Sequence, residues 1–219
     1  MEAFVFYVSP SEFVGRRDIR VLGIDPSIAN CGWGVIEVGR LVECGVIHPA
    51  SRGEFERYEE IERRLTEVIE RLKPDIASVE QFQHFFRAPE GATEPNGSRR
   101  GRHNRKQANP DSMFKLKGAQ TTVVSTCLRL GLGVVCYFPQ QWKGAKEKSV
   151  NRMMMDGLYK VKLPNDDTAD GVGLAHHYLS FRRGIDPVMY SGEPQGDVRL
   201  WVQPIDPLAS ARKALRKSA

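Results

Sequence analysis

The 219-residue sequence predicts an α/β fold built on a mixed sheet of five strands, of which the first three are antiparallel. Three short apolar runs, 20–25, 32–38 and 41–48, follow one another with only short turns between them, as antiparallel strands do. Helical patterns then alternate with two further apolar runs, 76–80 and 134–138. An apolar content of 41 % in a chain of this length is enough for one globular core.

The first strand ends abruptly in an acidic residue. Asp25 closes the apolar run, and Pro26 stops the strand. Gly32 and Gly34 open the antiparallel return strand, and a short link at 39–40 leads into the third strand. An acid before a proline is common in turns, so Asp25 gains functional meaning only if other carboxylates converge on it.

Residues 53–72 predict an amphipathic helix, because apolar side chains recur every three or four positions. We interpret its opposite face, which is rich in Glu and Arg, as a solvated face with ion pairs one turn apart. The apolar stripe consists of Phe55, Tyr58, Ile61, Leu65, Val68, Ile69 and Leu72.

The strand at 76–80 repeats the pattern of the first strand, since it also ends in an acid, Glu80. Residues 87–110 follow, rich in Gly, Pro, Asn and Arg and without an apolar period, and they predict a long flexible insertion. Further helices are predicted at 111–130 and 146–159.

The last predicted helix reaches to about 181, with Asn165 or Asp166 as its N-cap. Its small residues Ala169, Gly171 and Gly173 are expected to allow close approach to the sheet. The tail after 183 is punctuated by Gly and Pro, and it holds a candidate strand at 198–202.

Two acids at the start of that helix, Asp167 and Asp170, are three positions apart and therefore share one face. Acids there can simply interact with the helix dipole. Four carboxylates in one cleft would repel each other, however, and hard divalent cations relieve that repulsion. Two Mg2+ or Mn2+ ions could then hydrolyse a phosphodiester. The candidate catalytic and metal-binding residues are Asp25, Glu80, Asp167 and Asp170.

Two segments are strongly basic. Residues 87–110 and 208–219 each carry a net charge of +4, which leaves the rest of the chain at −3. An acidic body with basic appendages predicts a polyanionic partner near an acidic centre, although basic segments also serve solubility. The candidate DNA-binding residues of the first segment are Arg99, Arg100, Arg102, Arg105 and Lys106.

The four cysteines have no paired spacing, which argues against a zinc site and a disulfide scaffold. We interpret them as reduced thiols of a cytoplasmic protein. No apolar run approaches the roughly 18 residues that span a bilayer, and the N-terminus lacks the features of a signal peptide. We therefore expect no membrane partner.

In the order and spacing of its motifs, the chain resembles the RuvC family of Holliday junction resolvases, which have the RNase H-like fold with helices on both faces of the sheet. The similarity covers about residues 20–183, with 1–19 as an N-terminal extension and 184–219 as a basic C-terminal tail. The matching motifs are the strand and hairpin at 22–36, Val79-Glu80-Gln81, the helix at 115–119, Lys143 with the run 147–150, and the acidic helix at 167–175.

The resemblance implies a homodimer with two active sites, each of which nicks one of two opposed strands at a four-way DNA junction. It also implies that Lys143 and Lys148 act at the scissile phosphate and that an aromatic residue wedges the junction open. The candidates for this wedge are Phe82, Phe85 and Phe86. Lys115 and Lys117 of the central helix are further candidate DNA contacts, and branch-migration proteins are a class of partner that the resemblance allows.

Three other functions compete with this one. Another RNase H-like nuclease would cut branched DNA or an RNA–DNA hybrid, but the run around Lys148 favours the resolvase. An actin-like ATPase needs two related domains, for which 219 residues are too few. A non-catalytic junction-binding protein would be expected to lack one of the four carboxylates, and all four are present.

Overall fold

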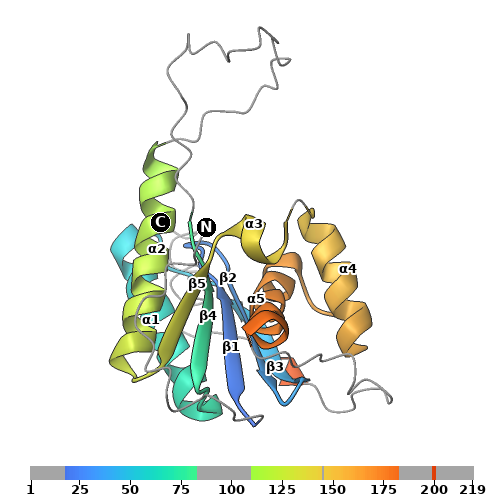
Figure 1. The fold of residues 1–219 in the computed structure, drawn as a ribbon. Helices are drawn as coiled ribbons and strands as arrows, with labels where there is room; N and C mark the ends of the chain where they lie inside the picture. The colour runs from blue at the N-terminus through green and yellow to red at the C-terminus, as the bar shows by residue number, and fades with distance from the viewer. Residues whose placement is uncertain (1–17, 83–109, 145, 183–198, 201–219) are drawn as a thin grey trace, which may run out of the picture.

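The computed structural model describes residues 18–82, 110–144, 146–182 and 199–200, which form a twisted sheet with helices on both faces (Figure 1). The strands lie in the order β5-β4-β1-β2-β3-β6. Their bounds are Arg20–Asp25 (β1), Cys31–Glu37 (β2), Arg40–Ile47 (β3), Ile76–Glu80 (β4), Gly133–Tyr137 (β5) and Arg199–Leu200 (β6). The five predicted strands are confirmed, and the two-residue β6 pairs with β3.

The helices are α1 (Glu54–Leu72), α2 (Pro110–Arg129), α3 (Pro139–Trp142), α4 (Lys148–Tyr159) and α5 (Asp166–His177), and a π-helical turn at Tyr178–Arg182 follows. Apart from this turn, α3 is the element that was not predicted. Pro139 stands in its first turn, where a missing N–H costs nothing. A four-residue helix has too few positions to show a period, which is why 139–142 reads as a turn in the sequence.

The direction of the strands brings their functional ends together. β2 runs antiparallel to β1 and β3, whereas β4 runs parallel to β1 and to β5. The carboxyl ends of β1, β4 and β5 therefore lie at one edge of the sheet, beside the start of β2. Sheets with parallel strands place ligands outside this edge.

Each face of the sheet has its own hydrophobic core. Leu22 and Ile24 of β1 point to the face covered by α1 and α2, while Val21 points to the face covered by α4 and α5. Because side chains alternate along a strand, Gly23 and Asp25 share the face of Val21. Asp25 therefore points toward α5 instead of into the α1–α2 core.

α5 lies directly on the backbone of β1 and β2. A Cβ atom at Gly23 would be 2.0 Å from the Gly171 carbonyl oxygen, and one at Gly32 would be 1.9 Å from the Asp167 carbonyl oxygen. A Cβ at Gly171 would in turn be 2.6 Å from the Cα of Trp33. Strand and helix glycines thus remove the side-chain layer that normally separates a helix from a sheet, and this seats the start of α5 at the sheet edge.

Two details differ from the predicted pattern. Gly173 faces Trp142 of α3 and not the sheet, because it lies two positions beyond Gly171 on the helix. Phe55 belongs to the predicted apolar stripe of α1 but is 78 % exposed, and its ring packs edge-on against Tyr58. Phe55 stands in the first turn of α1, while the buried part of the stripe begins at Ile61.

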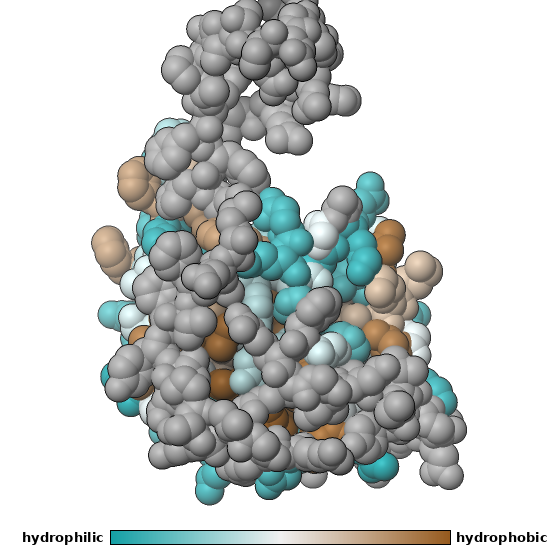
Figure 2. All heavy atoms as spheres, in the orientation of Figure 1, coloured by the Kyte–Doolittle hydropathy of each residue, from teal (hydrophilic) through white to brown (hydrophobic). Residues whose placement is uncertain are grey.

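Seen as a surface, the molecule is hydrophilic between α2 and α4, at the edge where the strands end, and apolar side chains are exposed on the outer side of α4 (Figure 2). Those α4 residues are Val150, Met153 and Met154. Within the described ranges, no helix has the length and apolar character that a membrane crossing needs. The predicted division into an extension, a domain and a tail remains a prediction, since 1–17 and most of 184–219 lie outside the described residues.

Candidate active site

Two carboxylates mark the ends of adjacent parallel strands. Ile24 of β1 pairs with Val79 of β4, so the next residues, Asp25 and Glu80, stand side by side at the sheet edge. The same alternation that turns Asp25 toward α5 also turns Glu80 there, because Ser78 on that face of β4 donates a hydrogen bond to the Leu174 carbonyl oxygen.

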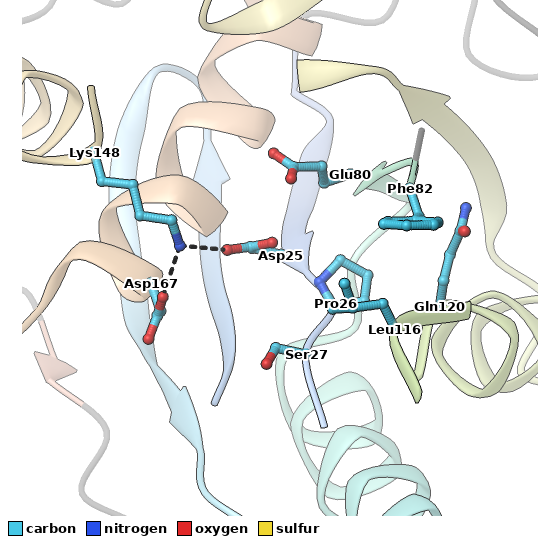
Figure 3. A pocket seen from close by; sticks show the side chains of 9 residues that line it. All are labelled: Asp25, Pro26, Ser27, Glu80, Phe82, Leu116, Gln120, Lys148 and Asp167. Atoms are coloured by element: carbon cyan, nitrogen blue, oxygen red, sulfur yellow. Dashed lines mark hydrogen bonds and ion pairs between the residues drawn. The ribbon is translucent and has the colours of Figure 1, made fainter. Parts of the chain in front are cut away.

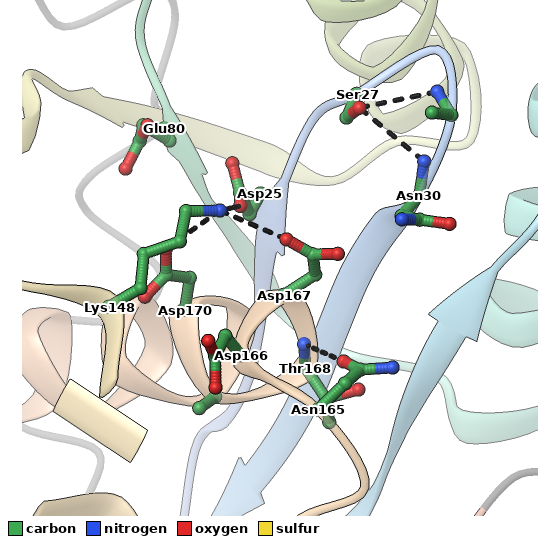
Figure 4. Close-up of polar contacts among 12 residues, drawn as sticks. Asp25, Ser27, Asn30, Glu80, Lys148, Asn165, Asp166, Asp167, Thr168 and Asp170 are labelled. Atoms are coloured by element: carbon green, nitrogen blue, oxygen red, sulfur yellow. Dashed lines mark hydrogen bonds and ion pairs between the residues drawn. The ribbon is translucent and has the colours of Figure 1, made fainter. Parts of the chain in front are cut away.

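The start of α5 supplies the other two carboxylates. Of the two predicted candidates for its N-cap, Asn165 is the one observed, and its side chain accepts a hydrogen bond from the Thr168 backbone N–H at 2.8 Å. Asp167 and Asp170 follow in the first turns, and Asp170 is fully buried. The glycine contacts under α5 hold these acids opposite Asp25 (Figure 4).

A cleft of about 210 Å³ opens beside these carboxylates. Figure 3 shows that its two sides differ: Asp25, Asp167 and Lys148 lie on one, and Phe82 and Leu116 lie on the other, beside the Gln120 amide. The lining is completed by Pro26, Ser27 and Glu80. The cleft therefore pairs an ionic wall with an apolar wall.

Two lysine ammonium groups lie among the carboxylates. Lys148 Nζ is 2.9 Å from Asp167 Oδ1, 3.5 Å from Asp170 Oδ2 and 3.6 Å from Asp25 Oδ2 (Figure 4). Lys143 Nζ is 3.2 Å from Glu80 Oε2 and 3.1 Å from Asp170 Oδ2. The structure thus brings all six predicted catalytic side chains into one cluster.

Burial and mutual repulsion act on the acids of this cluster. Burial raises the pKa of Asp25 to about 8, and the neighbouring Glu80 carboxylate adds to the effect, while Lys148 opposes it. Burial likewise raises the pKa of Glu80, against the lowering effect of Lys143. Ionised carboxylates are therefore costly here unless cations accompany them.

The lysines remain cationic. Burial acts to lower the pKa of both, but the carboxylates outweigh it, so the pKa of Lys143 and that of Lys148 both lie above the ordinary value of lysine. Lys148 is the more accessible of the two, with 49 % of its side chain exposed against 13 % for Lys143. The two ammonium groups thus partly balance the four carboxylates.

The donor set fits a hard divalent cation, since carboxylate oxygens are the ligands that Mg2+ and Mn2+ prefer. Among the described residues, however, no three His, Cys, Asp or Glu side chains stand close enough together to share one metal ion. The lysine ammonium groups lie between the acids, within 3.6 Å of carboxylate oxygens. A divalent cation at this site would take over the charge balance that the lysines provide.

The remaining predicted DNA contacts are only partly described. Phe82 lines the cleft, and Lys117 of α2 donates a hydrogen bond to Gln120, which also lines it. Lys115 is on the same helix but does not line the cleft. The other predicted contacts lie outside the described residues; they are Phe85, Phe86, Arg99, Arg100, Arg102, Arg105 and Lys106.

Two residues of the site were not predicted. The indole N–H of Trp142 donates a hydrogen bond to Glu80 Oε2 at 3.0 Å, and the Asn151 amide donates one to Asp170 Oδ1 at 2.8 Å. Both side chains are buried, at 9 % and 4 % exposed. An aromatic residue beside a lysine and an asparagine within a helix carry no sequence signal for this role, because their partners are distant along the chain.

The family model and the relatives that match this chain carry the same description. Residues 21–92 match the family model described as "Crossover junction endodeoxyribonuclease RuvC". A protein of that name from Synechococcus sp. (strain WH7803) is 32 % identical over 170 residues, which is 72 % of this chain and 96 % of the relative. Its namesake from Azorhizobium caulinodans is 34 % identical over 176 residues, which is 73 % of this chain and 90 % of the relative.

Solved structures show the same fold. The "Thermus thermophilus RuvC structure" superposes with a TM-score of 0.55 at 25 % identity, covering 76 % of this chain and 98 % of that one. The chain titled "T. thermophilus RuvC in complex with Holliday junction substrate" superposes with a TM-score of 0.60 at 24 % identity, covering 77 % of this chain and 97 % of that one.

These similarities extend over nearly the full length of the relatives and of the solved chains. The predicted RNase H-like fold is thereby confirmed. The chain belongs to the RuvC family of crossover junction endodeoxyribonucleases.

Proposed function

We propose that this chain is a structure-selective endonuclease that resolves four-way DNA junctions by paired nicks in opposed strands. The observation that carries the proposal is the convergence of four carboxylates, from β1, β4 and α5, on one sheet edge with two lysines among them. The names of the relatives support the substrate, since they are called crossover junction endodeoxyribonucleases.

We infer that Asp25, Glu80, Asp167 and Asp170 hold divalent cations, with Mg2+ as the natural ion, Mn2+ as its substitute, and two ions per site. When bound, such ions activate a water molecule and stabilise the leaving oxygen of a phosphodiester. The chain's own contribution is to hold the four carboxylates together beside the cleft, against their mutual repulsion.

Lys143 and Lys148 act on the charge of the substrate. Each ammonium group lies within hydrogen-bond distance of a carboxylate, so the lysines are directed into the site before any DNA binds. A cation that is already in place at the scissile phosphate stabilises negative charge that develops there without further reorganisation. Lys148, whose side chain is half exposed, is the better placed of the two to reach the DNA backbone.

The apolar wall of the cleft suits a nucleobase. Phe82 follows Glu80 by two residues and lies with Leu116 opposite the ionic wall (Figure 3). Aromatic side chains stack on unpaired bases, and such bases occur where strands exchange at a junction. We therefore assign Phe82 as the described member of the wedge that opens the junction centre.

Paired nicks need two sites with a fixed relative position, and we propose that two copies of the chain provide them as a homodimer. The support is the exposure of large apolar side chains on the packed helices α1 and α2: Phe114 of α2 is 74 % exposed and Phe55 of α1 is 78 % exposed. Large apolar side chains exposed together on a surface commonly mark an interface.

A cleavage assay tests the proposal. The protein is incubated with a synthetic four-way junction, a linear duplex of the same sequence or an RNA–DNA hybrid, each with Mg2+ or with EDTA. We expect symmetric nicks in the junction alone, and only with Mg2+. Asp25→Asn protein, purified in the same way, is the control for contaminating nucleases and is expected to be inactive.

Efficient cleavage of the hybrid with an intact junction would instead identify a different RNase H-like nuclease. Cleavage of the junction in EDTA would contradict the metal assignment. Sedimentation should give a dimer at micromolar concentration, and a monomer that still nicks both strands in concert would contradict the assembly.

A further inference from the structure

Two neutral N–H groups donate hydrogen bonds to the carboxylates of Glu80 and Asp170. Trp142 Nε1 donates to Glu80 Oε2 at 3.0 Å, and Asn151 Nδ2 donates to Asp170 Oδ1 at 2.8 Å. Neither donor lines the cleft. They therefore contact the acids from the protein side, where substrate does not reach.

Both donors meet at one glycine of α5. A Cβ atom at Gly173 would be 2.7 Å from Trp142 Cζ3 and 3.3 Å from both terminal atoms of the Asn151 amide. Gly173 thus leaves the space in which the indole and the amide pack side by side on α5. The close contact restricts both side chains, so each donor has a defined direction.

Each of the two hydrogen bonds anchors one oxygen of a carboxylate. Asp170 Oδ1 accepts from Asn151, and its Oδ2 faces the ammonium groups of Lys143 and Lys148. Glu80 Oε2 accepts from both Trp142 and Lys143, and among the described residues no donor reaches its Oε1. One oxygen of each acid is anchored, which orients the carboxylate.

A neutral donor is suited to this task. A lysine or arginine in the same place would add a positive charge that competes with a bound cation, whereas an indole N–H or an amide fixes direction alone. The indole also lies under Lys143, whose Nζ is 4.7 Å from the ring centroid, so it contacts both members of the Lys143–Glu80 pair.

We propose that Trp142 and Asn151, packed together on Gly173, are positioning residues that orient Glu80 and Asp170 for divalent cations. The inference rests on the proposed metal-dependent nuclease function. Partners that orient metal ligands contribute roughly 10- to 100-fold to metal affinity or activity, and the two donors are expected to have effects of that size.

The test compares Trp142→Phe and Asn151→Leu with the wild-type protein. Trp142→Phe keeps an aromatic side chain at this position but removes the N–H. Tyr159→Phe is the matched control, since it removes a buried aromatic hydroxyl, which shares a hydrogen bond of 3.0 Å with the His176 ring and does not contact the carboxylates. Mg2+ affinity is measured by calorimetry without DNA, and the melting temperature is measured in EDTA.

We expect Mg2+ affinity to fall by about 10-fold or more in Trp142→Phe and Asn151→Leu and to stay unchanged in Tyr159→Phe. Junction cleavage by the first two should recover as Mg2+ is raised, because the chemical groups of the site remain. If both variants bind Mg2+ as the wild type does while their melting temperatures fall, the two side chains only stabilise the fold and the inference is wrong.

The outcome also separates this inference from the function on which it rests. A wild-type protein that neither binds Mg2+ nor cuts junctions would overturn the proposed function and the inference with it. A wild-type protein that does both, beside variants with unchanged Mg2+ affinity, would overturn the inference alone.

Discussion

Asp167 of α5 lies directly over Gly32 of β2, so that a Cβ atom at Gly32 would be 1.9 Å from the Asp167 carbonyl oxygen. This contact joins backbone to backbone, and no side-chain rotation can relieve it. The position of an acidic residue in the site therefore depends on the absence of a side chain in a neighbouring strand.

Gly32→Ala should impair cleavage although it removes no functional group. The methyl group would push the start of α5 away from β2 and shift Asp167, and a displacement of about 1 Å at a reacting centre can cost on the order of 10²-fold in rate. Single-turnover cleavage of a four-way junction measures the effect.

Gly157→Ala is the matched control for that variant. Gly157 lies within α4, and a Cβ atom there would meet nothing within 4 Å. The substitution should leave cleavage unchanged and stabilise the helix by up to about 1 kcal/mol. Equal cleavage by the two glycine variants would contradict the role of Gly32.

Removal of any one carboxylate should nearly abolish cleavage while junction binding survives, because phosphate contacts supply most of the affinity. Asp166→Asn is the control, since Asp166 neighbours the site residues in sequence but pairs with Arg152. Single-turnover rates and gel-shift affinities are measured together, and near-normal turnover would remove that residue from the site. The test variants are Asp25→Asn, Glu80→Gln, Asp167→Asn and Asp170→Asn.

Asp25→Asn should also stabilise the metal-free protein. The pKa of Asp25 rises from 3.8 to about 8 on folding, so between these values the unfolded chain releases a proton that the folded chain retains. Stability of the wild type is therefore lost as pH rises through this window. Urea unfolding in EDTA at pH 8 should show the variant more stable by about 0.5–2 kcal/mol.

Mg2+ should reverse that order, because a ligand bound only to the folded state stabilises it by RT ln(1 + L/Kd), where L is the free ligand concentration, and the wild type is expected to bind Mg2+ more tightly than the variant. Urea unfolding in EDTA is repeated at pH 4, where the difference in the free energy of unfolding between the wild type and Asp25→Asn should shrink. A wild type that is the more stable of the two in EDTA at pH 8 would show that the Asp25 carboxylate is not penalised by burial.

Lys143→Met and Lys148→Met should lower the rate of cleavage far more than the affinity for the junction, on the order of 10²-fold or more in single turnover. Lys162→Met, at an exposed position beyond the end of α4, is the control for loss of a positive charge. Equal losses of rate and affinity would identify Lys143 and Lys148 as ordinary phosphate contacts.

The basic insertion 87–110 is predicted to clamp the junction centre, where phosphates of four arms crowd together. All of it except Pro110 lies outside the described residues, and its net charge of +4 carries the prediction. Each phosphate neutralised on duplex DNA contributes about −0.9 to the slope of log affinity on log salt.

Deletion of the insertion should therefore flatten the salt dependence by several contacts and weaken junction binding more than duplex binding. Mg2+ affinity should not change, since the carboxylates come from other segments. An unchanged salt slope with an unchanged preference for junctions would show a tolerated surface insertion.

The sequence identifies the acids of the site better than it identifies the residues that donate hydrogen bonds to them. Asp25 and Glu80 could be predicted because each ends an apolar strand, and Asn165 because a cap must precede its helix. Trp142 and Asn151 could not, since a hydrogen bond to a residue 62 or 19 positions away leaves no local pattern. Long-range packing, rather than periodicity, decides such contacts.

The same limit explains the misplaced details of the fold. Gly173 was expected against the sheet because small residues on a helix indicate a close contact, but composition does not say with which neighbour. Phe55 fits the apolar period of α1, but a period cannot show that this ring, in the first turn of the helix, is 78 % exposed.

The position of α5 in the chain has a consequence for biosynthesis. Asp25 and Glu80 are made early, but Asp167 and Asp170 leave the ribosome only after most of the sheet has been translated. Domains fold as units and their N-terminal parts emerge first. An incomplete chain, whether still growing or cut short, holds only two of the four acids and lacks the helix that covers one face of the sheet, so the complete site forms only together with the finished domain.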